Sequence, residues 1–204
     1  MTAYRRLAAW LIAMSFNSVV YFGSSFLSGG GTVLPESAID QFIGVTPWAI
    51  VPYLSFFLLI PLAFLKIPEA RVWPLAAAIM ASSFVAAVVF LVCPTTLAYP
   101  RFPVTDLAGF VTHHLRGLDT PQNCLPSLHG AITYLCLFAW LPSLRRPAKA
   151  VLLAWGASIC WSAIALRQHL AIDITAGILL GAICAGVVFR SFARRRIAIP
   201  GRPI

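Results

Sequence analysis

Two short polar stretches stand at the ends of long apolar runs, and both contain side chains that can do chemistry. In 169-HLAID-173, His169 and Asp173 are four residues apart, so a helix would place them on one face within reach of each other. A carboxylate bonded to one imidazole nitrogen fixes the tautomer and leaves the other nitrogen free as a nucleophile or ligand. A structural pair that only joins two helices has the same spacing, so this pair alone leaves both interpretations open.

The second stretch is 126-PSLH-129. Proline suits the first turn of a helix, because its missing N–H would lack a partner there anyway. The amides of Ser127, Leu128 and His129, with the serine hydroxyl, would then form an anion site. Taken alone, the PSLH stretch is typical of an ordinary helix cap. Together with the first stretch it supplies two histidines, a carboxylate, an anion site and nearby arginines, which are the groups that phosphoryl transfer requires.

The composition predicts a polytopic membrane protein. The 204 residues are 60% hydrophobic and 10% charged, and the mean hydropathy is +0.87. The net charge of +9 does not indicate nucleic acid, because the basic residues form short clusters between apolar runs. We expect a single all-α, membrane-embedded domain over residues 1–204. Six segments have about the 20 residues that a membrane-spanning helix needs: about 7–27, 47–65, 72–93, 127–144, 148–167 and 170–190.

The distribution of basic residues predicts the orientation. With the N-terminus in the cytoplasm, twelve of the fifteen basic residues fall inside, and only Arg101, Arg116 and Arg167 fall outside. Positively charged loops favour the cytoplasmic side. Both termini should therefore be cytoplasmic, and the two polar stretches should share the outer face.

The long outer loop contains two further features. Its weakly amphipathic part, 104–118, is expected to form a short helix along the membrane surface. Within it, His113 and His114 are adjacent and would point apart, so we interpret them as solvated histidines. Cys93 and Cys124 flank the loop, and a disulfide between them is one possibility in an oxidising compartment. The other cysteines, Cys136, Cys160 and Cys184, lie within the spans and are expected to pack there.

PSLH, followed about forty residues later by RQHLAIDITAG, resembles the type 2 phosphatidic acid phosphatase superfamily, whose pattern is KxxxxxxRP, PSGH and SRxxxxxHxxxD. The last motif keeps Ser162, His169 and Asp173, but Ala163 replaces its arginine. Arg167 is the natural substitute. Arg101 can stand for the first-motif arginine, whereas Pro94 occupies the place of its lysine. The stretch 119-DTPQNCLPSLH-129 is similar to the sphingolipid-synthase-like branch.

This resemblance implies a six-helix bundle that acts on a lipid phosphate at the outer leaflet, in a bacterial inner membrane. It implies that His169 attacks phosphorus to form a phosphohistidine, that Asp173 orients His169, and that His129 protonates the leaving oxygen. Arg167, Arg101, Ser127 and Leu128 would hold the phosphate, with no metal or other cofactor and no nucleic acid partner. Oligomeric state is open.

The acceptor and two other classes of function also stay open. Water as acceptor gives a phosphatase, the favoured interpretation, and an alcohol gives a phosphotransferase. A metal-dependent hydrolase would use His129, His169 and Asp173 as ligands, although Arg167 would repel its cation. A non-catalytic transporter would spread polar residues through the membrane depth, whereas here they gather at one end.

Overall fold

Helices dominate the computed structural model, which describes residues 3–27, 30–98, 107–118 and 122–198. The elements within these ranges are, in chain order, α1 (Ala3–Leu27), β1 (Thr32–Val33), α2 (Ala38–Ile43), the 3₁₀ helix η1 (Pro47–Ala49), α3 (Ile50–Leu54), α4 (Phe56–Lys66), α5 (Glu69–Val92), β2 (Thr95–Thr96), α6 (Leu107–Leu118), α7 (Leu128–Trp140), the 3₁₀ helix η2 (Leu141–Ser143), α8 (Arg146–Ala165) and α9 (Ala171–Ala198).

Five helical segments in the described ranges are long and apolar enough to cross a membrane: Ala3–Leu27, Pro47–Lys66, Glu69–Val92, Arg146–Ala165 and Ala171–Arg195. The chain is therefore an integral membrane protein. The segment expected at 127–144 forms a shorter apolar helix, Leu128–Ser143. The all-α membrane fold is confirmed, while the count of six spans stays a prediction.

Helix ends differ from the expected spans where charged residues continue a helix. α5 begins at Glu69 rather than 72, and α9 runs through its arginine cluster to Ala198. Hydropathy marks the part of a helix that suits lipid, whereas backbone hydrogen bonds continue into the polar boundary. The second span is interrupted at Ser55, whose hydroxyl accepts a hydrogen bond of 2.8 Å from Trp155 Nε1 on α8.

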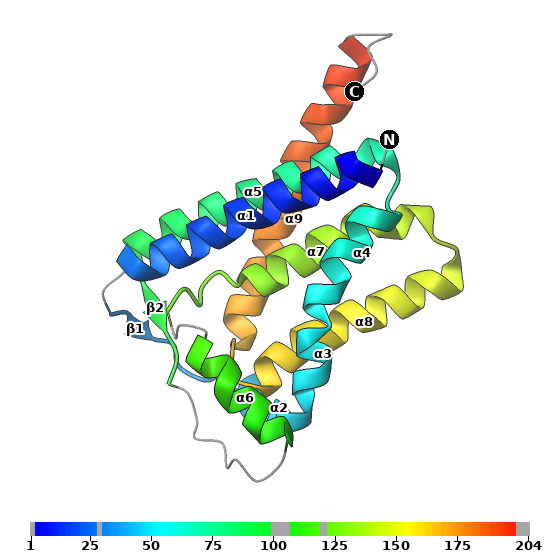
Figure 1. The fold of residues 1–204 in the computed structure, drawn as a ribbon. Coiled ribbons are helices and arrows are strands. Elements are labelled where there is room, and N and C mark those ends of the chain that lie inside the picture. The colour runs from blue at the N-terminus through cyan, green and yellow to red at the C-terminus, as the bar shows by residue number, and fades with distance from the viewer. Residues whose placement is uncertain (1–2, 28–29, 99–106, 119–121, 199–204) are drawn as a thin grey trace.

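The packing of the helices places the polar stretches together. α7 packs most extensively on α9, and α1 on α5. Figure 1 shows the described N- and C-terminal parts and the α4–α5 turn at one end of the bundle, with α2 and α6 at the other. The core beneath the polar end is apolar and includes Leu59, Phe64, Leu75, Phe90 and Leu135.

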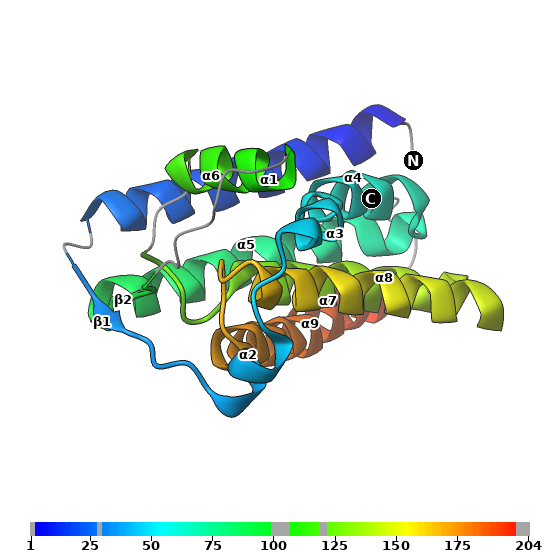
Figure 2. The same ribbon diagram turned by 90° about the horizontal axis from the view of Figure 1, so that it is seen from below.

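The segments at the α2 and α6 end are short. β1 pairs in parallel with β2, with Thr32 opposite Thr95. α6 forms within the segment expected to be amphipathic and contacts η1 and α3. Figure 2 shows α6 and α2 on opposite faces of the molecule. Its location along a membrane surface stays a prediction. Cys93 is exposed and Cys124 is buried, and no disulfide joins these two described residues.

Candidate active site

Glycines allow α7 and α9 to approach closely. A Cβ atom added to Gly177 would clash with the carbonyl oxygen of Ser127, and one added to Gly130 would lie 2.7 Å from that of Ile174. Small residues let helix backbones pack together in membranes, where apolar association is weak. This close approach brings the start of α7 against the start of α9.

Asp173, His169 and His129 form a continuous hydrogen-bonded chain at that contact. Asp173 Oδ2 lies 3.0 Å from His169 Nδ1, and His169 Nε2 lies 3.0 Å from His129 Nδ1. With Asp173 ionised, this network assigns the His169 proton to Nδ1. Nε2 then carries the lone pair and accepts from the Nδ1–H of His129. The contact predicted from the spacing of His169 and Asp173 is present, and it extends to a third residue.

The helical spacing of His169 and Asp173 does not itself join them, because α9 begins only at Ala171 and does not include His169. His169 lies in the turn between α8 and α9. Arg167, with φ of 55°, adopts the left-handed conformation that ends α8. The amides of Gln168 and His169 then both donate to the carbonyl of Ala163. The turn still directs the His169 ring to Asp173 in the first turn of α9.

His129 packs among aromatic side chains that sequence reasoning did not identify. Its ring centroid lies 4.5 Å from that of Phe56 and 5.0 Å from that of Tyr53. Its Nε2 atom is buried and has no hydrogen-bond partner among the described residues. A buried polar atom without a partner is unfavourable and needs an explanation. Phe56 and Tyr53 lie in a generally apolar span, so no spacing or motif distinguishes them.

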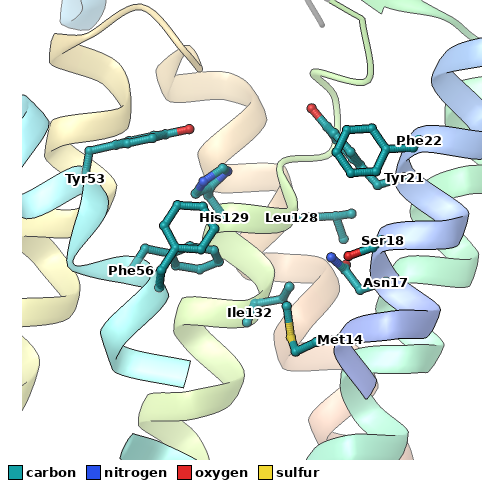
Figure 3. A pocket seen from close by; sticks show the side chains of 11 residues that line it. Met14, Asn17, Ser18, Tyr21, Phe22, Tyr53, Phe56, Leu128, His129 and Ile132 are labelled. Atoms are coloured by element: carbon teal, nitrogen blue, oxygen red, sulfur yellow. The ribbon is translucent and has the colours of Figure 1, made fainter. Parts of the chain in front are cut away.

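A cavity of about 250 Å³ opens beside His129. Figure 3 shows Tyr53, Phe56 and His129 on one side of it and residues of α1, such as Met14 and Asn17, on the other. Leu128 and Ile132 complete the wall between them. The lining is mostly apolar, so the cavity suits a hydrocarbon group better than a polar one.

The start of α7 is a capped helix terminus, as the proline and serine suggest. The Ser127 hydroxyl accepts from the Gly130 amide at 3.3 Å. The Ser127 amide, expected to be free, instead donates to the carbonyl of Asp173 at 2.9 Å. This bond exists because the glycine contact brings the two backbones together. Of the three expected donors, the structure therefore leaves the amides of Leu128 and His129 for an anion.

Arg167 lies in the same turn as His169 but is extensively bound by protein. Its Nε donates to Glu36 Oε1 at 2.9 Å, and its Nη2 donates to the Asp40 carbonyl at 2.7 Å. Its Nη1 donates to the carbonyls of Ile164 and Gly44. Four of its five N–H groups thus have partners, and the side chain is buried. This arrangement leaves Arg167 its charge and one N–H for a substrate.

The remaining sequence candidates lie away from this cluster or outside the described residues. Arg101 belongs to the second group. His113 and His114 are exposed on α6, where the His114 ring contacts the carbonyl of Phe110. Within residues 3–27, 30–98, 107–118 and 122–198, no three His, Cys, Asp or Glu side chains are grouped to hold a metal ion.

A model of the PAP2 superfamily matches residues 71–197, a segment that contains both polar stretches, the helices α7 and α8, and all but the last residue of α9. Neither the curated proteins nor the solved structures include a significant match to the chain.

Proposed function

Because the chain belongs to the PAP2 superfamily, we propose that it is a membrane phosphatase that hydrolyses a lipid phosphomonoester or pyrophosphate at the outer leaflet. Membership supports action on phosphate esters, by hydrolysis or by transfer. The single observation that carries the proposal is the hydrogen-bonded chain Asp173–His169–His129. It joins a carboxylate, an oriented imidazole and a second imidazole in the order that phosphohistidine chemistry needs.

In the first step, Nε2 of His169 forms a bond to phosphorus while the bond from phosphorus to the leaving oxygen breaks. His129, in its protonated form, gives a proton to that oxygen. Asp173 accepts a hydrogen bond from the Nδ1–H group of His169 and stabilises the positive charge that develops on the His169 ring. The unpaired Nε2 of His129 supports this assignment, because a substrate oxygen would provide its missing partner.

In the second step, water attacks the phosphohistidine. His129, now neutral, takes a proton from the water as its oxygen bonds to phosphorus. The N–P bond breaks and inorganic phosphate leaves, so His169 regains its lone pair. An alcohol in place of water would make the same step a phosphotransfer.

Substrate binding must separate the two histidines. An attacking nitrogen lies about 3–3.5 Å from phosphorus before reaction, with the leaving oxygen on the far side of that atom. The 3.0 Å distance between His169 Nε2 and His129 Nδ1 leaves no space for this arrangement. We therefore propose that the phosphate replaces this hydrogen bond, and that the His129 ring moves to the leaving oxygen.

Charge on the phosphate would be met by the free amides at the α7 start and by cationic side chains. Phosphoryl transfer distributes charge over three equatorial oxygens, and amides at a helix start are suited to them. Leu128 and His129 supply the amides, while Ser127 supports them as the helix cap. Arg167 contributes its charge and one N–H, and Arg101 remains a proposed contact outside the described residues.

The apolar cavity supports a lipid rather than a soluble substrate. His129 forms part of its wall, so a hydrocarbon chain in the cavity would be continuous with a phosphate at the histidine pair. Phe22 and Phe57, which also line it, are more than half exposed on the outside of the bundle. A lipid could therefore reach the cavity from the bilayer without passing through water.

The metal-dependent alternative fits the geometry less well. Asp173 and His129 bind opposite nitrogens of the same His169 ring. Three groups arranged in a row through one ring do not converge on a point, as the ligands of one ion must.

The experiment that tests the proposal uses purified protein in detergent and a panel of lipid phosphates and pyrophosphates, with and without alcohol acceptors. Release of inorganic phosphate and formation of phosphorylated acceptor are measured together. Brief incubation with ³²P-labelled substrate, followed by an alkaline quench that preserves phosphohistidine, should label wild type but not His169→Ala. Turnover without any labelled wild-type protein would contradict the covalent mechanism.

A further inference from the structure

Asp40 is a fully buried carboxylate in the short helix α2, far from the two polar stretches in sequence. Its Oδ1 accepts a 2.7 Å hydrogen bond from the amide of Ala171, the first residue of α9. Its Oδ2 accepts from the amide and the hydroxyl of Ser37, at 2.7 and 2.6 Å. One carboxylate therefore caps its own helix and binds the start of α9.

The same segment also binds the other side of the turn that carries His169. Arg167 donates from Nη2 to the carbonyl of Asp40, and from Nη1 to that of Gly44. Just beyond α2, the amide of Thr46 donates to the carbonyl of Ala165 at 2.9 Å. The segment 36–46 thus holds residues 165, 167 and 171, which bracket His169 on both sides.

The charge of Asp40 suits this location. Burial alone would raise the pKa of the Asp40 carboxyl. The hydrogen bonds from Ser37 and Ala171, together with the positive charge of Arg167, more than offset that effect and hold the pKa below its ordinary value. An ionised carboxylate at a helix N-terminus also interacts favourably with the exposed amides there.

We propose that Asp40 is a positioning residue, which fixes the 166–171 turn so that His169 Nε2 is held at the reacting position opposite His129. This inference rests on the proposed function. Asp40 contacts neither histidine, so it acts only through Ala171 and Arg167. Without the carboxylate, Ala171 would lose its attachment to α2 and Arg167 a nearby negative charge, although the bond of Arg167 to the Asp40 carbonyl would remain. A shift of about 1 Å in a reacting group can reduce turnover about 100-fold.

The test compares Asp40→Ala, Asp40→Asn and Ser37→Ala in the full-length protein. Asp40→Ala removes both acceptors, while Asp40→Asn can keep the acceptor for Ala171. Ser37→Ala removes the cap hydroxyl but leaves the Ala171 bond, so it is the matched control. We expect kcat to fall about 10- to 100-fold in Asp40→Ala with KM unchanged, less in Asp40→Asn, and less than about twofold in Ser37→Ala. The proposal would be overturned if kcat fell equally in Asp40→Ala and Ser37→Ala and the fall followed their melting temperatures.

A second measurement does not depend on activity. In protein labelled with ¹⁵N-histidine, the ring signals of His129 and His169 should shift in Asp40→Ala and stay in place in Ser37→Ala. Unchanged ring signals in Asp40→Ala would overturn the positioning role, whatever substrate the protein uses. If wild type hydrolyses no phosphate ester while the ring signals respond as expected, the proposed function fails and the role of Asp40 in placing His169 stands.

Discussion

His129 Nδ1 and His169 Nε2 lie 3.0 Å apart, although forty residues separate them in the chain. His169 Nε2, the nitrogen proposed as nucleophile, therefore already has a hydrogen-bond partner in this structure. In the proposed mechanism, His129 is therefore both the hydrogen-bond partner of the resting nucleophile and the group that moves to the leaving oxygen.

The proton donated by His129 should matter most for poor leaving groups. We expect His129→Ala to slow hydrolysis of an alkyl phosphate by about 10²- to 10⁴-fold, and to slow a p-nitrophenyl phosphate much less, because nitrophenolate leaves without a proton. Rates of phosphate release for the two substrates provide the comparison. Equal losses on both would argue against a general-acid role.

Activity should survive chelation and be inhibited by vanadate. The proposed site meets phosphate charge with helix-start amides and cationic side chains, and vanadate can take the five-coordinate geometry of the transition state at His169. Phosphate release is measured with EDTA, with added zinc or magnesium, and with vanadate. Loss of activity in EDTA that a metal restores would replace the histidine-nucleophile mechanism with the metal-dependent one.

The contact between α7 and α9 should tolerate no added side chain. Gly177→Ala places a Cβ atom against the carbonyl oxygen of Ser127, so the helices must separate. We expect a loss of about 1–3 kcal/mol in the free energy of unfolding, and a loss of activity because His129 moves away from His169. Gly186→Ala is the control, since its Cβ would meet nothing within 4 Å. Thermal unfolding in detergent and turnover are measured for both, and similar behaviour of the two variants would contradict the close-contact argument.

Filling the cavity should discriminate between substrates by chain length. Met14→Trp adds bulk to the cavity wall on α1 and should reduce activity on a long-chain lipid phosphate about tenfold, which corresponds to about 1.4 kcal/mol of lost binding. A short-chain, water-soluble phosphate should be affected much less. Val19→Trp is the matched control, because Val19 is 72% exposed on the same helix and does not line the cavity. Equal effects of Met14→Trp on both substrates would count against a chain-binding cavity.

Thiol labelling in intact cells tests the proposed orientation. Cys93 is exposed and lies on the side predicted to face outward, so an impermeant maleimide should label it from outside. Arg146→Cys, in a Cys93→Ser background, should react only after the cells are opened. The buried native cysteines should react slowly in both cases. The reverse pattern would place the histidine pair on the cytoplasmic side.

The membrane class, most of the helices and the contact between His169 and Asp173 could be predicted from the amino-acid sequence. These features depend on local information, such as a run of apolar residues or a four-residue spacing, and the PSLH and HLAID stretches carried enough of it to identify the family. The predicted bounds of the helices were less accurate than their order. The hydropathy from which the spans were predicted leaves out charged helix ends, and it contains no signal for a left-handed residue such as Arg167.

The groups that meet across the bundle could not be predicted in this way. The bond between His129 and His169 depends on the glycine contact of α7 with α9, and the aromatic rings around His129 come from a separate span. The spacing of Ser37 and Asp40 is typical of a helix cap and does not indicate that Asp40 is buried against Ala171, 131 residues away. Likewise, Arg167 was expected to bind a phosphate, whereas most of its N–H donors bind the segment 36–46. Such pairings depend on how helices distant in sequence pack together. The periodicity of a single helix indicates which of its faces is buried, but not which helix packs against that face.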